Sequence, residues 1–315
     1  MDLRRQAVHF VVLLATAVAA PAFGQTPPPT MAAPAAQSPK SIPDFSGIWV
    51  HPFLGFENPE SGPGPVRNKS RLRSGVSNFD QLVGDHTNPI LKPHAAEIVK
   101  KMGEISQSGL AFPDPDNQCM AQPVPYIFWN FEITFLQQTD KITMLYHHDH
   151  DYRQIRMNGR HPEKVTPSVH GDSIGWYEGD TLVIDTVGVR VGKHRTLDRF
   201  GTPYTEALHV VERYKLVDYA ATMEGLARAG KEWGRVPSYA IDANYKGKGL
   251  QLEFTVEDEG VFTMPWKSTI TYGRAAHTAW EEFVCAENLG FYKTSGAQYY
   301  SDPNARGPEA EKPDF

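Results

Sequence analysis

A period-two alternation of apolar and polar residues is the feature that most limits how this chain can fold. Within residues 249–256 every second side chain is apolar, from Leu250 to Val256. Successive side chains of a β-strand point to opposite faces, so this pattern predicts a strand with one buried face. The same reasoning predicts strands over residues 44–49, 126–135, 142–146, 153–157, 173–177, 181–189, 207–217, 249–256 and 262–272. Residues 280–285 fit a last strand or a short helix.

Short turns separate these strands and indicate how they pair. Asn158-Gly159 is a strong turn dipeptide, and Glu178-Gly179-Asp180 joins two strands as a hairpin. Roughly eight to ten antiparallel strands at this spacing form a barrel or a sandwich. Residues 91–106 have helical spacing, whereas 50–90 and 219–247 lack a regular period. We therefore expect a mainly β fold, an antiparallel lipocalin-like β-barrel with one N-terminal helix and long loops.

The first 24 residues have the parts of a signal peptide. Arg4 and Arg5 precede the apolar stretch 7–20, and small residues lie just before Gln25. An uncleaved membrane anchor is the alternative, although the stretch is shorter than the roughly 20 residues of a spanning helix. We expect a periplasmic or secreted protein. Its expected parts are a signal peptide (1–24), a disordered linker (25–43), a single barrel domain (44–300) and a loose tail (301–315).

Composition and cysteine content limit the partners that this chain can have. The net charge is -6 and the sequence pI is about 6.1, so the chain lacks the basic footprint of a protein that binds nucleic acid or anionic membranes. Cys119 and Cys285 either form one disulfide in an oxidising compartment or remain buried free thiols. The sequence has no phosphate-binding glycine loop and no dinucleotide fingerprint, so we expect no organic cofactor.

The histidines that most resemble a chemical site lie within residues 141–185. If the strand from Ile142 keeps its alternation, the inward face that carries Tyr146 also carries two histidines and a tyrosine. Polar groups near one end of an apolar barrel are typical of a small-ligand site. The candidate catalytic residues are His148, His150, Tyr152 and Glu212, and the candidate substrate-binding residues are Tyr146, Arg153, His161, His170 and Asp172.

Two kinds of chemistry suit these side chains. Imidazoles titrate near neutral pH, so His148 and His150 would serve as acid and base, with Glu212 orienting one of them. His-x-His on a strand also presents two ligands to a divalent metal ion, with Glu212 or His161 as a third. The alternatives without chemistry are exposed histidines at a strand end and a structural ion pair between Glu212 and Arg153.

Four segments of the chain resemble an uncharacterised family of exported bacterial proteins. They read YRQIRMNGRHP (152–162), GDSIGWYEGDTLVIDTVG (171–188), LDRFGTPYTEALHVVERY (197–214) and FTMPW (262–266). The resemblance covers residues 44–285 and implies export and a lipocalin-like, or calycin-like, barrel pattern. The family has no agreed activity, so the resemblance assigns no catalytic residue. Turns explain its recurrent glycines but not Arg153, His161 and Glu212.

Together these features predict a periplasmic enzyme that acts by acid–base catalysis on a small apolar or aromatic compound. It would be a lyase, an isomerase or a hydrolase without an organic cofactor, and a divalent metal ion at His148 and His150 is a further option. A non-catalytic lipocalin-like protein that binds a small hydrophobic ligand is the alternative, and a structural envelope protein is a third. We expect neither nucleic acid as a partner nor membrane insertion after signal cleavage.

Overall fold

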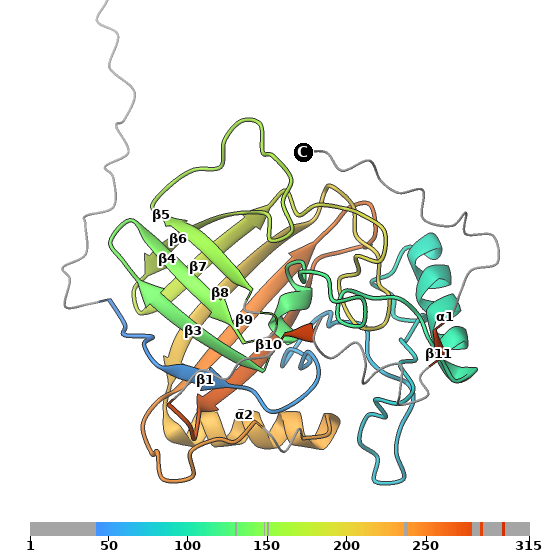
Figure 1. The fold of residues 1–315 in the computed structure, drawn as a ribbon, viewed down its shortest axis with the longest axis horizontal. Helices are drawn as coiled ribbons and strands as arrows, with labels where there is room; N and C mark the ends of the chain where they lie inside the picture. Colours follow the sequence, from blue (N-terminus) through green and yellow to red (C-terminus); the bar gives the residue numbers. More distant parts are fainter. Residues whose placement is uncertain are drawn as a thin grey trace, which may run out of the picture. The chain divides into compact units, whose positions relative to one another are not determined.

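The protein is built around a closed β-barrel of nine strands (Figure 1). The computed structural model describes residues 42–129, 131–147, 149, 151–235, 239–278, 284–285 and 298–299. Neighbouring strands follow the order β1-β10-β9-β8-β7-β6-β5-β4-β3. Their bounds are β1 Ile48–Val50, β3 Glu132–Gln137, β4 Lys141–Tyr146, β5 Tyr152–Met157, β6 Asp172–Glu178, β7 Thr181–Val187, β8 His209–Val217, β9 Gly249–Glu257 and β10 Trp266–Arg274. A separate two-stranded sheet consists of β2 (Leu110–Ala111) and β11 (Gln298–Tyr299).

The predicted barrel is confirmed, but its strands are not all antiparallel. β5 and β6 run parallel, with Ile155 paired to Ser173 and Met157 to Gly175. A parallel pair needs a crossover of about a dozen residues or more, and residues 158–171 supply it. The turn dipeptide at the start of this crossover predicts equally well a simple hairpin, which is why the sequence indicated only antiparallel pairing.

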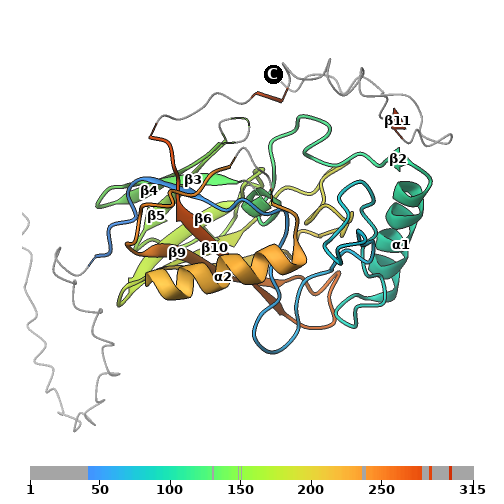
Figure 2. The same ribbon diagram turned by 90° about the horizontal axis from the view of Figure 1, so that it is seen from below.

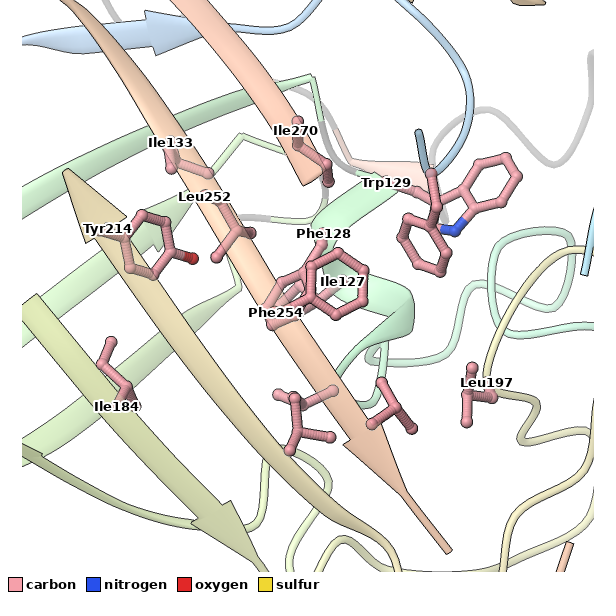
Figure 3. Packing of buried hydrophobic residues seen from close by; sticks show 14 of the residues in the cluster. Ile127, Phe128, Trp129, Ile133, Ile184, Leu197, Tyr214, Leu252, Phe254 and Ile270 are labelled. Atoms are coloured by element: carbon pink, nitrogen blue, oxygen red, sulfur yellow. The ribbon is translucent and has the colours of Figure 1, made fainter. Parts of the chain in front are cut away.

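Side chains at alternate strand positions fill the barrel, as the period-two pattern predicts. Ile142, Met144 and Tyr146 of β4 are each at most 1% exposed. Figure 3 shows part of this core, in which the rings of Phe128 and Phe254 lie 5.1 Å apart in an edge-to-face arrangement. Such pairs add to the stabilisation that burial of apolar area supplies. Packed aromatic and aliphatic side chains therefore occupy the interior that these strands surround.

The segment that begins at residue 126 differs from the expected strand. Tyr126–Trp129 form a 3-10 helix, η2, and β3 starts only at Glu132. The N–H of Ile127 donates to the carbonyl of Pro123 at 2.9 Å, which closes a tight turn instead of a strand ladder. All four residues of η2 are buried. Their apolar character therefore reflects burial on all sides and not alternation between two faces.

Helix α1 (Pro93–Gln107) confirms the predicted N-terminal helix, but a second helix was missed. Helix α2 (Tyr219–Glu232) lies across β9 and β10 (Figure 2), where we expected an irregular insertion. The Asp218 carboxylate caps α2 by accepting a hydrogen bond from the Ala221 N–H at 2.8 Å. Most residues that α2 buries are small, and a Cβ on Gly225 would come within 2.3 Å of Thr271 Oγ1. So small an apolar face gives little periodic signal.

A disulfide joins Cys119 to Cys285, which decides between the two alternatives for this cysteine pair. The expected last strand at 280–285 lies mostly outside the described residues, as do the expected signal peptide, most of the linker and the tail. Within the described ranges, no helix combines the length and the apolar character that a membrane crossing requires.

Candidate functional site

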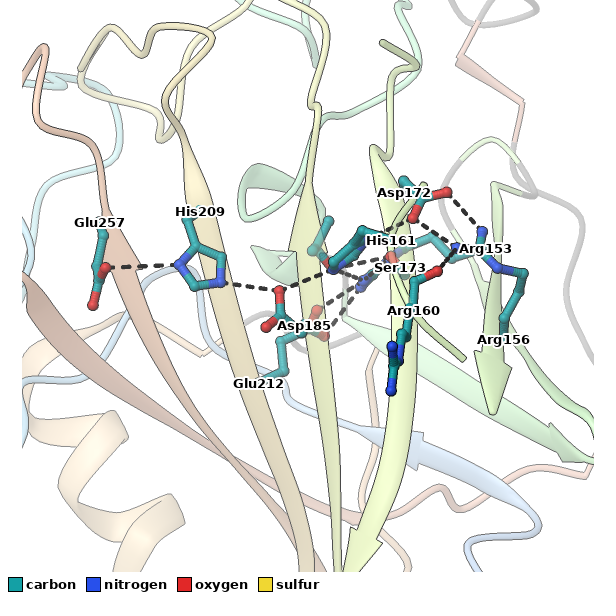
Figure 4. Close-up of polar contacts among 11 residues, drawn as sticks. Arg153, Arg156, Arg160, His161, Asp172, Ser173, Asp185, His209, Glu212 and Glu257 are labelled. Atoms are coloured by element: carbon teal, nitrogen blue, oxygen red, sulfur yellow. Dashed lines mark hydrogen bonds and ion pairs between the residues drawn. The ribbon is translucent and has the colours of Figure 1, made fainter. Parts of the chain in front are cut away.

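Three of the predicted site residues meet inside the barrel, where Arg153 of β5 and Glu212 of β8 form an ion pair (Figure 4). Nη2 and Nη1 of Arg153 donate to Oε1 and Oε2 of Glu212 at 2.7 and 3.0 Å. The two side chains are 2% and 0% exposed. Hydroxyl groups complete the cluster: those of Tyr146, Ser173 and Thr186 accept from Arg153, and that of Tyr214 donates to Glu212.

This interior pair is suited to stabilising the barrel and not to proton transfer. Burial alone would lower the pKa of Arg153, but the Glu212 carboxylate, Tyr146 and Tyr214 together outweigh it and raise that pKa above its ordinary value. Burial also raises the pKa of Tyr146 to about 12. Glu212 faces inward, as its strand position predicts, yet its carboxylate pairs with Arg153 and does not orient an imidazole. Arg153 is closed off from solvent and so has no access to a substrate outside the barrel.

The predicted inward position of Tyr152 is wrong. β4 ends at Tyr146, the chain turns, and β5 starts at Tyr152 with the opposite phase, so that its side chain is 60% exposed. Arg153 takes the inward place instead. His148 and His150, the predicted acid and base, lie outside the described residues.

A carboxylate and two imidazoles meet beside the histidine-rich turn that joins β4 to β5. Glu132 Oε2 lies 3.5 Å from Nδ1 of His147 and 3.3 Å from Nε2 of His277. The side chains of Glu132 and His147 are buried, and that of His277 is partly exposed. The predicted residue His170 lies beside a different carboxylate, with its Nε2 3.7 Å from Asp151 Oδ2.

The predicted residues His161 and Asp172 meet on the outer face of the barrel, within a larger network (Figure 4). His161 Nδ1 lies 2.6 Å from Asp172 Oδ1, and its Nε2 lies 3.2 Å from Asp185 Oδ1. His209 Nε2 approaches the same Asp185 oxygen at 2.9 Å, and its Nδ1 lies 3.7 Å from Glu257 Oε2. The sequence did not predict three members of this network, Asp185, His209 and Glu257. All three occupy outward-facing positions of strands whose side chains alternate between apolar and polar.

This outer network attaches the crossover 158–171 to the barrel wall. Both ring nitrogens of His161 face carboxylates, one from β6 and one from β7. The hydrogen bond from Arg156 holds the pKa of Asp172 below its ordinary value. Burial would raise the pKa of Asp185, but the hydrogen bonds and charges of His209 and His161 together outweigh it and lower that pKa. Each imidazole nitrogen of His161 and His209 faces a carboxylate, so the network is suited to holding the crossover against the barrel.

Replacing His209 by Gln should destabilise the protein more in mildly acidic than in alkaline solution. The hydrogen bond to Asp185 raises the pKa of His209 above 6.5. Its contribution to the free energy of unfolding is therefore fully present below pH 6.5 and is lost as the pH rises through the raised value. Because His209 and Asp185 are both partly exposed, we expect the loss of stability at acidic pH to exceed that at alkaline pH by at most ~1 kcal/mol. Urea unfolding at about pH 5.5 and about pH 9 measures this difference, and equal losses would contradict it.

A cavity of about 550 Å³ lies on the outer face of the barrel, beside the C-terminal half of α2. Segment 56–61, Arg67 and the α2 residues Arg228, Lys231 and Glu232 form part of its wall. The strands contribute outward-pointing residues: Lys215, Gln251, Glu253, Lys267 and Thr269. Charged groups of both signs therefore dominate the lining.

Glu57 is the most deeply buried charged residue that lines this cavity, at 3% exposed. Its backbone pairs with Thr269 of β10 through N–H···O bonds of 3.2 and 3.3 Å. Arg228 Nε donates to Oε2 at 3.2 Å, and the Thr271 backbone adds a hydrogen bond to the carboxyl group. Burial raises the pKa of Glu57 to about 7, although the Arg228 charge opposes this. The carboxyl group is thus close to half-ionised at neutral pH.

Replacing Glu57 by Gln should stabilise the protein increasingly as the pH rises. Folding raises the pKa of Glu57 from 4.5 to about 7. Relative to a variant without the carboxyl group, the wild type is therefore most stable below pH 4.5. It loses stability as the pH rises from 4.5 to about 7. Gln does not titrate, so the variant escapes this loss. The gain above pH 7 should be on the order of 3 kcal/mol at most. Urea unfolding from about pH 4 to about pH 8 measures it, and a gain that does not change with pH would contradict the raised pKa.

Comparisons with known proteins found no matching protein-family model, no similar curated protein and no similar solved structure. Among the residues that the structure describes, no group of three or more His, Cys, Asp or Glu side chains could hold a metal ion, and this includes the clusters around Glu132 and Asp185. The predicted metal ligands His148 and His150 are outside that set.

Proposed function

We propose that the protein is an exported enzyme that moves protons to and from a small anionic substrate, with Glu57 as its acid–base group. One observation carries this proposal: a buried carboxyl group with a pKa of about 7 borders a cavity of about 550 Å³. Such a group can accept a proton and return it at the same pH, and perturbed carboxyl groups in clefts are typical of catalytic sites.

The cations around Glu57 favour an anionic substrate over the apolar or aromatic compound expected from the sequence. Arg67 and Lys267 already pair with carboxylates of the lining. Lys215 and Lys231 have no carboxylate within ion-pair distance among the described residues. These two ammonium groups are therefore available for a carboxylate or phosphate group of the substrate.

In the proposed reaction, ionised Glu57 removes a proton from a carbon next to a carbonyl or carboxyl group of the substrate. The electron pair of the broken C–H bond moves toward the substrate oxygen, where the charge of Arg228 or Lys231 stabilises the enolate. Protonated Glu57 then returns the proton to a different carbon of the delocalised enolate, which makes the enzyme an isomerase. Return to the same carbon regenerates the substrate and is observed only as exchange with solvent. If the electron pair instead expels a group from the adjacent carbon, the enzyme is a lyase.

Export and a lipocalin-like relationship remain part of the proposal. The apolar stretch near the N-terminus, the disulfide and the barrel pattern support them. The alternative function, binding of a hydrophobic ligand inside the barrel, is less well supported. Buried side chains such as Tyr146, Tyr214 and Phe254 occupy the space that such a ligand would need.

Proton exchange with solvent tests the proposed function. We would incubate the protein in D₂O with a panel of small carboxylates and sugar phosphates and follow loss of C–H signals by proton NMR. We expect exchange that rises with pH through about 7 as Glu57 ionises and falls by about two to four orders of magnitude in Glu57→Gln. The control Glu97→Gln, an exposed residue of α1, should keep the wild-type rate. Exchange that persists in Glu57→Gln, or its absence across the panel with the wild type, would overturn the proposal.

A further inference from the structure

A second cavity, of about 460 Å³, lies near the N-terminal half of α2, and its lining differs in kind from that of the Glu57 cavity. Its walls come from α2, from segment 241–248 and from the adjoining ends of β9 and β10. The volume is within the range of roughly 300–1,000 Å³ that is typical of small-molecule sites. It contains neither Glu57 nor any residue of the interior ion pair.

The body of this second cavity is apolar and aromatic. Apolar side chains line it from both sides, and Met223 is 44% exposed on α2 even though it is a large hydrophobic residue. The residues of this apolar body are Pro52, Phe53, Met223, Leu226, Ala227 and Ile241. Tyr219 and Tyr245 add ring faces.

Four cations surround this apolar body: Arg235, Lys246, Lys248 and Arg274. Within the described part of the chain, none of the four has a carboxylate at ion-pair distance. The one lining carboxylate, Asp242, accepts the N–H of Asn244 at 2.8 Å. The cavity therefore has an excess of positive charge at an apolar site, which favours an anion with a hydrophobic body.

Two of these cations are held in place by aromatic rings. The Arg274 guanidinium lies 3.9 Å from the Trp49 ring centroid and 5.2 Å from that of Tyr245, and its Nη1 donates to the Ser46 carbonyl at 2.8 Å. Lys246 Nζ donates to the Tyr219 hydroxyl at 2.9 Å. A guanidinium has five N–H donors, so Arg274 retains donors for a ligand. Positioning before binding lowers the entropy cost of pairing with an anion.

We propose that this second cavity binds a small amphipathic anion, with an alkyl or aromatic body against Met223 and Ile241 and a carboxylate or sulfonate group paired with Arg274 and Lys248. The site is independent of the proposed catalysis at Glu57. It also differs from the ligand site expected inside the barrel, because it lies on the outer wall under α2.

Competition between matched ligands tests this proposal. Anilinonaphthalene sulfonate serves as the fluorescent probe, and decanoate and decanol serve as competitors that share a chain and differ in charge. We expect one saturable site per chain and displacement by decanoate at a concentration about tenfold below that needed for decanol. Affinity for decanoate should also decrease as salt concentration rises.

Three variants locate the bound anion. Met223→Trp should block the cavity from an exposed position of α2 and abolish probe binding. Lys248→Gln and Arg274→Gln should each weaken decanoate by about tenfold and leave decanol unchanged. Arg190→Gln, an exposed arginine that lines neither cavity, is the matched control. Because Arg274 stacks on Trp49, Lys248→Gln is the variant with less risk to folding.

Two results would overturn an anion site in this second cavity. Probe binding that survives Met223→Trp would place the probe elsewhere on the protein. Equal affinity for decanoate and decanol would show a hydrophobic groove without anion selectivity. Glu57→Gln should leave probe binding unchanged, so failure at one site does not imply failure at the other.

Discussion

Replacing Glu212 by Gln should lower the free energy of unfolding by about 3–5 kcal/mol. The substitution removes the charge that faces Arg153 but leaves the guanidinium inside the barrel, 2% exposed and without a counterion. An unpaired charge in a low-dielectric interior costs far more than the pair contributes when it is intact. Urea unfolding monitored by tryptophan fluorescence gives the midpoint and the slope from which this loss is calculated.

A double variant shows whether the pair itself or the orphaned charge causes this loss. Arg153→Met combined with Glu212→Leu removes both charges and keeps apolar volume, so it should be destabilised much less than Glu212→Gln alone. In the double variant the hydroxyls of Tyr146, Ser173 and Thr186 lose Arg153 as a hydrogen-bond partner. One another and water replace it only in part, so some loss of stability is expected. A Glu212→Gln loss below about 1 kcal/mol would contradict a closed interior and would indicate water access to Arg153.

The inward position of Glu212 could be predicted from the sequence because strand alternation fixes which face a side chain occupies. The same rule placed Ile142, Met144 and Tyr146 correctly. It failed at Tyr152 because the phase holds only within one strand, and the turn after Tyr146 resets it. The spacing of apolar and polar residues over 146–152 does not indicate where that turn occurs.

The contacts between distant segments could not be predicted in this way. His161 reaches Asp185 only because β5 and β6 are parallel and the crossover returns along the outer wall. His209 reaches the same carboxylate through the register of β7 and β8. Alternation indicates that these side chains face outward, but strand order and register decide which of them meet.

Glu57 illustrates a site that sequence periodicity does not detect at all. It lies in an irregular segment rich in Gly and Pro, where exposure is the ordinary expectation. Its burial depends on pairing with Thr269 and on the approach of α2, a helix whose small buried face gave no clear pattern. The raised pKa therefore arises from tertiary packing and not from any local motif.

Replacing Cys119 and Cys285 together by Ser should lower the free energy of unfolding by about 4–5 kcal/mol. The disulfide links positions 166 residues apart, so reduction releases a very long loop in the unfolded chain. In the chain-entropy account this release stabilises the unfolded state, and the increment grows only with the logarithm of loop length. Urea unfolding of the oxidised wild type and the double variant measures the difference.

The slope of the unfolding curve distinguishes that account from a loss of folded-state contacts. An unfolded chain without the cross-link expands and exposes more surface, so the slope should be steeper in the double variant than in the oxidised wild type. Local contacts are also at stake, because the Cys285 N–H donates to Asp149 Oδ1 at 2.6 Å, within the histidine-rich turn. If the slope stays unchanged while stability falls, the disulfide acts mainly by preserving contacts of the folded protein such as the Cys285–Asp149 hydrogen bond.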